Sequence, residues 1–184
     1  MPPRVVDHGT ATVAWRPTPW DADGLGVAHT IELTAVTGAD ADLAAALATV
    51  DAEAIAAGAV LATTRVDEAA VAELAALTAA GYRAIEQSCA LRVDLAAPPR
   101  PIARRAVAIE PATPADATAL ADLAGDGFDY SRFHEDPRIH PSRARARYRR
   151  WIVDSLSNGD QVWLHRHHGA VAALMSFRRA GAHV

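Results

Sequence analysis

Residues 111–156 carry the clearest signal for a fold in this chain, and they read PATPADATALADLAGDGFDYSRFHEDPRIHPSRARARYRRWIVDSL. Thr113 is a suitable helix N-cap, Pro114 fits the first helical position, and Asp116 favours the positive end of a helix. We therefore predict that a helix begins here. Residues 128–141 follow as an expected loop that is rich in aromatic and charged side chains.

A second helix is predicted over residues 142–156, because apolar and small side chains recur near one face while arginines lie opposite. We expect this helix to end around Asn158 and Gly159. The residues of its expected inner face are Ala144, Tyr148, Trp151, Ile152 and Ser155.

Strands are expected on both sides of these two helices. Residues 107–110 form the first, and residues 161–166 and 170–177 follow the second helix. Because His168 and Gly169 separate the last two strands, we predict a hairpin there.

The first half of the chain predicts a mixed sheet with helices packed against it. PTPWDADGLG, residues 17–26, is dense in turn formers and is expected to connect the first two strands. The elements expected are strands at residues 12–16 and 27–36, a helix at 40–57, a strand at 60–65, a helix between 67 and 81, and a long strand at 82–95.

Caps, stops and apolar stripes define the two helices of this half. Asp40 or Asp42 could cap the first helix, which Gly58 would end, and Asp67 would cap the second, with Gly81 at its end. The apolar stripes expected to face the core are Leu43, Leu47, Val50 and Ile55 in the first helix, and Val71, Leu74 and Leu77 in the second.

The proline-rich stretch AAPPRPIARR, residues 96–105, separates the two halves. Proline removes a backbone donor and biases the preceding residue toward an extended conformation, which is typical of a linker. We therefore predict an N-terminal α/β lobe at residues 1–96, a linker at 97–105 and a second domain at 106–184. The expected fold class is α/β (α+β).

The composition excludes several classes of protein. The 184 residues are 51% hydrophobic and 22% charged, which is typical of a globular chain, and the net charge of −4 provides no positive field for nucleic acid or anionic lipid. The single cysteine, Cys89, lies in an alternating apolar run and predicts a buried thiol in a reducing compartment. Since no signal segment or membrane span is evident, we expect a cytoplasmic protein without a membrane partner.

The stretch quoted above resembles the Gcn5-related N-acetyltransferase (GNAT) superfamily, in particular its dTDP-fucosamine acetyltransferase group. SRFH followed by DP and a downstream Tyr-x-x-Trp-Ile carries this resemblance, and PWDADGLGV at residues 19–27 is similar to a Pro-Trp-Asp-x-x-x-x-Gly stretch of those two-domain enzymes. The resemblance covers residues from about Trp15 to Ser176. It implies the N-terminal half of a GNAT fold at residues 106–184, and transfer of an acetyl group from acetyl-CoA to a primary amine, often on a nucleotide-linked sugar.

Two features of the family are missing up to Val184, where another strand could begin. They are the Gln/Arg-x-x-Gly-x-Gly/Ala loop that binds the CoA pyrophosphate, and a late tyrosine that acts as general acid. We therefore assign no cofactor-binding residue and no general acid, and we expect this chain alone to turn over slowly or not at all. A fragment, a truncated gene product and a half-protein completed by another chain remain open.

If no strand follows Val184, the strand at residues 170–177 has an open edge. An open edge of this kind predicts self-association. It also supports an alternative to an enzyme. In that alternative the chain is a non-catalytic ligand-binding or interaction protein that dimerises.

The loop after the first helix of the second half is the best candidate for a substrate site, because it combines aromatic, guanidinium, imidazole and carboxylate groups. Arg132 suits a phosphate of a sugar nucleotide. His134 or Asp129 could bind the acceptor ammonium or remove its proton, and we take His134 as the possible catalytic base. The predicted substrate-binding residues are Asp129, Tyr130, Ser131, Arg132 and His134.

A purely structural interpretation of the same loop is also open. Phe128 and Phe133 would then anchor the loop to the core, while Arg132 would pair with Asp129 or Asp136. The acceptor itself stays open among sugar, peptide and antibiotic amines.

Other patterns are interpreted as structural. The arginines at residues 143–150 spread around a helix and favour a solvated face over nucleic-acid binding. His165, His167 and His168 could bring two ligands together, but no third is identified, so we expect no metal.

The remaining glycines and tryptophans follow the same interpretation. Gly24 and Gly26 lack the third glycine of a dinucleotide site. We expect Trp151 and Trp163 to face the second core and Trp20 to fix the N-terminal loop.

Overall fold

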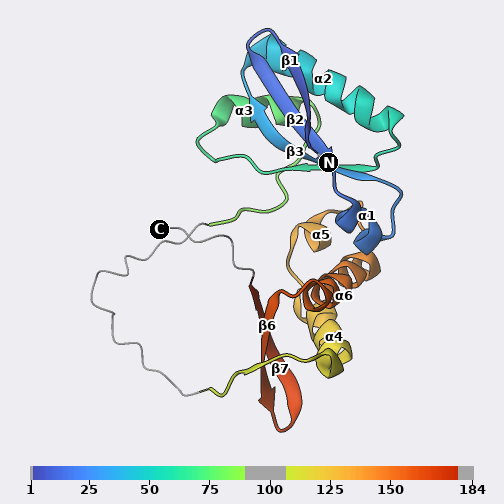
Figure 1. Ribbon diagram of the computed structural model, residues 1–184. Coiled ribbons are helices and arrows are strands. Elements are labelled where there is room, and N and C mark those ends of the chain that lie inside the picture. Colours follow the sequence, from blue (N-terminus) through green and yellow to red (C-terminus); the bar gives the residue numbers. More distant parts are fainter. Residues whose placement is uncertain (1, 90–106, 178–184) are drawn as a thin grey trace, which may run out of the picture. The chain divides into compact units, whose positions relative to one another are not determined.

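The structure is a computed structural model that describes residues 2–89 and 107–177. The chain divides into two compact units, Met1–Ala84 and Ile85–Val184. Each unit combines helices with a sheet, so the predicted α/β class is confirmed (Figure 1). Within the described ranges, no helix has the length and apolar character needed to cross a membrane.

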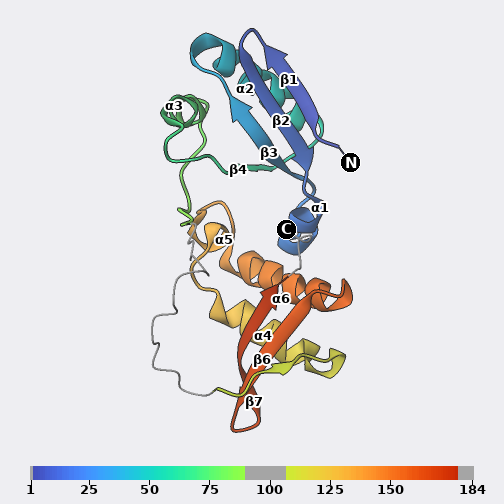
Figure 2. The same cartoon turned by 60° about the vertical axis from the view of Figure 1, so that its left-hand side comes forward.

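The first unit contains a four-stranded mixed sheet with the order β1-β2-β3-β4, whose strands lie side by side in Figure 2. The pairs β1·β2 and β2·β3 are antiparallel, and β3·β4 is parallel. This confirms the predicted mixed sheet. The strands are β1 (Arg4–His8), β2 (Ala11–Pro17), β3 (Thr30–Thr37) and β4 (Leu61–Thr64).

Helix α2 (Asp40–Ala56) connects the parallel strands and packs on the sheet, close to the predicted bounds. Its N-cap residue is Ala39, so neither Asp40 nor Asp42 is the cap; Asp42 accepts hydrogen bonds from Thr10 instead. Three of the four residues of its predicted stripe are buried, while Ile55 is 73% exposed. The core that this packing creates contains Ala11, Val13, Trp15, Ile31, Leu33, Leu43, Ala46, Leu47, Val50, Ala54 and Leu77.

The prediction of a turn region at residues 17–26 is wrong, because Pro19–Leu25 forms a short helix, α1. Proline at its first position and Gly26 in the left-handed conformation after its end are compatible with a helix as well as with a turn. The Trp20 ring on this helix is 46% exposed, with the Arg16 guanidinium 5.6 Å from its centroid.

The segment after β4 departs further from the sequence-based expectations. Helix α3 (Val71–Ala79) begins later than predicted, since Asp67 caps only the turn before it by accepting from the Ala69 N–H at 2.8 Å. Of its predicted stripe only Leu77 is buried. Residues 82–89 are not a strand, and Cys89 is exposed, so the buried thiol was a wrong prediction.

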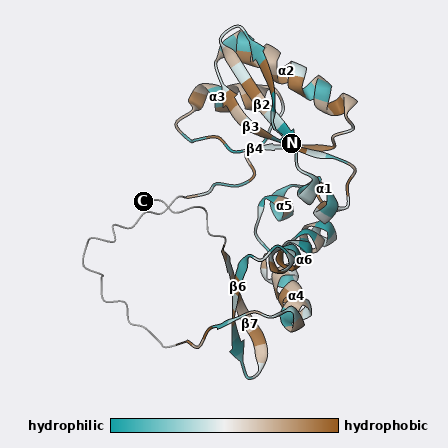
Figure 3. Cartoon of the chain, in the orientation of Figure 1, coloured by the Kyte–Doolittle hydropathy of each residue, from teal (hydrophilic) through white to brown (hydrophobic). Residues whose placement is uncertain are grey.

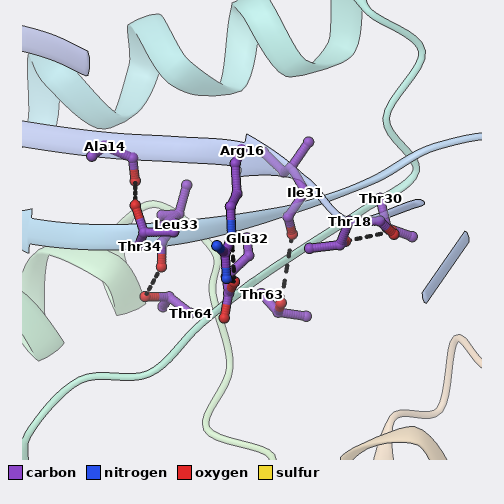
Figure 4. Close-up of polar contacts among 10 residues, drawn as sticks. All are labelled: Ala14, Arg16, Thr18, Thr30, Ile31, Glu32, Leu33, Thr34, Thr63 and Thr64. Carbon is purple, nitrogen blue, oxygen red and sulfur yellow. Dashed lines mark hydrogen bonds and ion pairs between the residues drawn. The ribbon is translucent and has the colours of Figure 1, made fainter. Parts of the chain in front are cut away.

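Polar side chains connect neighbouring strands of this sheet (Figure 4). Arg16 on β2 donates to the Glu32 carboxylate on β3 through Nε and Nη2, at 3.1 and 2.7 Å. Thr64 on β4 donates to the Leu33 carbonyl of β3 at 3.2 Å. The edge strand β4 is therefore attached to β3 by side-chain as well as backbone hydrogen bonds.

The second unit contains a three-stranded antiparallel sheet with the order β5-β6-β7. The strands are β5 (Glu110–Pro111), β6 (Gln161–His167) and β7 (Ala170–Phe177). The hairpin is confirmed, with both turn residues at positive φ, His168 at 50° and Gly169 at 82°. The predicted strand at residues 107–110 is largely wrong, because only Glu110 of that range belongs to β5.

Four helical segments lie between β5 and β6 in the described chain: the 3₁₀ turn η1 (Pro114–Asp116), α4 (Ala117–Gly127), the one-turn α5 (Arg132–Glu135) and α6 (Pro141–Ser157). Thr113 is the N-cap of η1, and its N–H and hydroxyl both donate to the Asp116 carboxylate. The predicted helix start is thus confirmed, with a first turn that is 3₁₀. The predicted loop contains α5.

The predicted inner face of α6 is confirmed, since Ala144, Ile152 and Ser155 are buried and Tyr148 and Trp151 are partly buried. Trp163 does not belong to this core, because Val162 and Leu164 occupy the inward positions of β6. The alternation of a strand places Trp163 on the other face. The core consists of Leu120, Ala124, Ile152, Val162 and Leu164.

Gly125 permits close packing of α4 against α6. A Cβ at this position would lie only 2.6 Å from Arg149 Nε and 2.7 Å from its Cγ. The Arg149 side chain therefore crosses α4 over a position without a side chain, and its guanidinium pairs with Asp122 at 2.6 Å.

The predicted linker at residues 97–105 lies outside the described residues, as does most of the strand predicted at 82–95. The domain bounds around this linker stay predictions.

The core of the first unit provides a stability test within one helix. Leu47 is fully buried, so Leu47→Ala should lower the free energy of unfolding by about 2–5 kcal/mol through lost burial and the cavity left behind. Ile55→Ala on the exposed side of α2 should change it by about 0.5 kcal/mol or less. Urea unfolding followed by circular dichroism measures both, and equal effects would contradict the packing described.

The Asp116 carboxylate predicts a dependence of stability on acid pH. Hydrogen bonds from the Thr113 backbone, and then from Arg166, lower its pKa to about 2. Because the folded-state pKa lies below the unfolded value, these contacts stabilise the protein fully above about pH 4, and the stabilisation is lost as pH falls toward 2. Asp116→Asn should reduce the slope of unfolding free energy against pH in that window, measured by urea titrations.

Asp129→Asn is the control for net charge, because it removes a carboxylate of the same type from an exposed site. The interpretation fails if the two variants show the same slope between pH 4 and 2.

Candidate functional site

The predicted substrate loop is ordered around a single turn of helix in the second unit. Ser131 is the N-cap of α5, and its Oγ accepts the Phe133 N–H at 3.3 Å. The Ser131 carbonyl accepts the N–H groups of His134 and Glu135 at 2.8 and 2.9 Å. These bonds fix the backbone that carries His134.

The His134 imidazole is held by a hydrogen bond at one ring nitrogen and by stacking on one ring face. Its Nδ1 lies 3.0 Å from Ser131 Oγ, and its ring stacks on Tyr148 with centroids 5.8 Å apart and an interplanar angle of 15°. Its Nε2 is buried and has no hydrogen-bond partner within the described part of the chain. A buried ring nitrogen without a partner is the kind of group that a bound molecule or water would satisfy.

Tyr148 of α6 is the centre of an aromatic cluster that sequence reasoning assigned only to the helix core. Its ring stacks on Phe128 at 4.7 Å and meets Phe133 and Trp151 edge to face, at 6.2 and 6.3 Å. Helical spacing showed that Tyr148 faces inward. It did not show that residues 128–134 fold back over this ring.

The arginines near the loop lie over the Phe133 ring. Arg132 and Arg147 have guanidinium carbons 4.7 and 5.6 Å from its centroid. The Arg132 N–H also donates to Glu86 at 3.0 Å. Asp136, one of the two pairing partners expected for Arg132, is bound by Arg138 through two short hydrogen bonds, which raise the pKa of the Arg138 guanidinium.

Two predicted site residues point elsewhere. Tyr130 is 88% exposed, and Asp129 is exposed as well. No described contact joins either of them to His134. Of the predicted set, the structure therefore brings Ser131 and His134 together. Arg132 follows Ser131 as the first residue of α5.

The other sequence patterns do not add to this site. His165 interacts with the Ala108 carbonyl at 2.8 Å, and no described group of three or more His, Cys, Asp or Glu side chains could hold a metal ion. On α6, Arg149 pairs with Asp122 and Arg150 pairs with Asp154. These two arginines are thus engaged in surface ion pairs.

A groove of about 520 Å³ lies between α2 and α3 of the first unit and was not expected. Alanines line it, with Asp40 and Asp51 as its charged residues. Burial raises the pKa of Asp51, which accepts a hydrogen bond from the Tyr82 hydroxyl at 3.1 Å. Alanine side chains offer no specific contact to a ligand, so we assign this groove no role.

The Ser131–His134 arrangement can accept a proton or hydrogen-bond a ligand at Nε2. No family model matches the chain, and a search of the curated proteins finds no similar sequence.

Proposed function

We propose that this chain is an N-acetyltransferase of the GNAT type, which moves an acetyl group from acetyl-CoA to a primary amine, possible acceptors including a nucleotide-linked amino sugar. The observation that carries the proposal is the buried Nε2 of His134, which lies beside the Tyr148 ring and has no hydrogen-bond partner among residues 2–89 and 107–177. The order β5, α4, α6, β6, β7 in the second unit is compatible with the order of elements that opens a GNAT fold.

In the proposed reaction His134 is the base. An ammonium group must lose a proton before its nitrogen can attack a thioester, and a base must reach that proton directly or through one water. Nε2 then takes one proton, the amine nitrogen bonds to the acetyl carbon, and the C–S bond breaks. The second proton, which the nitrogen sheds after the attack, neutralises the departing thiolate.

Arg132 has the role of binding an anionic part of the acceptor. A guanidinium recognises phosphate or carboxylate through two parallel hydrogen bonds. The Arg132 guanidinium lies over the Phe133 ring, which meets the Tyr148 ring on which His134 stacks, and this supports an acceptor that also carries an anion. We also propose a cytoplasmic location, because a free, exposed thiol such as that of Cys89 stays reduced there.

The activity test uses acetyl-CoA with a panel of amines: a nucleotide-linked amino sugar, a peptide amine and an aminoglycoside. His134→Asn should lower the rate of acetyl transfer by about 100-fold or more, because a general base typically contributes 10²–10⁴-fold. Acetylated amine is measured by mass spectrometry, since a thiol reagent would also react with exposed Cys89.

His168→Asn is the matched control, because His168 lies in the hairpin turn at positive φ, which asparagine tolerates. Equal rates in the two variants would remove His134 from the reaction. Because this chain alone is expected to turn over slowly, the assay uses long incubations at high protein concentration. Absence of any acetylated amine under these conditions would overturn the proposal that this chain acts as an enzyme.

A second candidate function, an interaction protein that self-associates, is favoured by β7. This strand pairs only with β6 among the described strands and contains no charged residue. Met175 and Phe177 are 54% and 42% exposed, and Figure 3 shows β7 as mainly hydrophobic beside a more hydrophilic β6. Natural edge strands usually carry charges or prolines that prevent pairing, and β7 has neither.

Self-association through β7 predicts a particle heavier than the 19.4 kDa chain at about 100 µM under reducing conditions. Met175→Lys should return the mass to that of one chain, because a charge in an edge strand opposes pairing. Val5 is 56% exposed on β1, an edge strand of the other sheet, and Val5→Lys should leave the mass of the wild-type particle unchanged. Light scattering after size exclusion measures all three, and a monomeric wild type contradicts the interaction.

A further inference from the structure

Ser131 and His134 form one of two histidine–serine pairs in the second unit, and the two pairs differ in their hydrogen bonding. In the first pair Ser131 Oγ lies 3.0 Å from His134 Nδ1. In the second, Ser142 Oγ lies 2.8 Å from His140 Nδ1. Either oxygen could donate to the ring or accept from it, so the backbone around each pair must decide the tautomer.

At the second pair the backbone decides directly. His140 Nδ1 accepts the N–H of Ser142 at 3.3 Å, which requires a lone pair on Nδ1. The proton of the neutral His140 ring is therefore on Nε2, and the Ser142 hydroxyl donates.

At the first pair the backbone N–H goes to the serine instead. Ser131 Oγ accepts from Phe133 N–H, and a hydroxyl oxygen has a second lone pair that can accept from His134 Nδ1. The alternative is that Ser131 donates to Nδ1, which would place the ring proton on Nε2.

The burial of Nε2 separates these alternatives. A proton on Nε2 would be a buried N–H donor without an acceptor among the described residues, and such orphaned N–H groups are rarer in proteins than buried acceptors without a donor. The Tyr148 face cannot accept that proton, because the two rings are within 15° of parallel and an in-plane N–H runs along the tyrosine ring. A proton on Nδ1, donated to Ser131, avoids an orphaned N–H group.

We propose that Ser131 is the positioning residue for His134: it accepts the Nδ1 proton, fixes the Nδ1–H tautomer and leaves a lone pair on Nε2. This inference deepens the proposed function, because only this tautomer of the neutral ring can remove a proton through Nε2. Ser131 acts through His134 and touches no reacting atom.

The test is the tautomer of each ring, read from long-range proton–nitrogen correlations in ¹⁵N-labelled protein at about pH 8. His134→Gln and His140→Gln identify the two sets of signals among the 8 histidines. We expect a protonated Nδ1 in His134 and a protonated Nε2 in His140. A protonated Nε2 in His134 of the wild-type protein overturns the proposal, and this measurement needs no variant of Ser131.

Ser131→Ala should shift the His134 ring toward the Nε2–H form, while Ser142→Ala is the matched control and should leave His134 unchanged. If His134 keeps the Nδ1–H form without the Ser131 hydroxyl, Ser131 is not the positioning residue. Correlations in the wild-type chain require neither an amine nor acetyl-CoA. A confirmed tautomer together with no acetylated amine would therefore leave this inference standing and the proposed function overturned.

Discussion

The packing of residues 128–134 against Tyr148 is the constraint on which the candidate site depends. A four-residue helix such as α5 has too few internal hydrogen bonds to be stable in isolation. Phe128, Phe133 and His134 all contact the Tyr148 ring, so aromatic contacts hold the loop at both of its ends. Aromatic pairs of this kind contribute about 0.5–1.5 kcal/mol each beyond the area that they bury.

Asp116 fixes the start of the first helix of the same unit against the sheet. Its carboxylate caps the first turn through Thr113 and also binds Arg166 of β6, which in turn donates to Glu110 of β5 at 2.6 Å. One acidic side chain thus connects a helix start to two strands. The position of α6, and with it the Tyr148 ring, follows from packing against this helix and sheet.

The sequence predicted those elements whose signals are local. Thr113, Pro114 and Asp116 specify a helix start within four residues, and the inner face of α6 follows from helical spacing. The prediction failed where one pattern fits two structures. Pro, Asp and Gly between residues 17 and 26 suit a turn or a short helix, and the alternation through Tyr82–Cys89 suits a strand only if a neighbouring strand is available to pair with it.

The sequence predicted which segment contains the candidate site, but it did not predict which side chains of that segment lie together. Residue chemistry singled out Ser131 and His134, which the structure brings together, but also Asp129 and Tyr130, whose exposure depends on how the loop turns. Tyr148 was expected in the core because spacing reports only which way a helix face points. Its contact with an imidazole 14 positions earlier is a tertiary effect that no local signal contains.

The absence of a side chain at Gly125 restricts which substitutions this position can accept in related sequences. The Arg149 side chain fills the space that a Cβ would occupy, while Gly125 needs no unusual backbone angle. Volume, and not conformational freedom, is what restricts this position. Among natural variants of this fold, residues 125 and 149 should therefore change together, a larger residue at 125 accompanying a shorter one at 149.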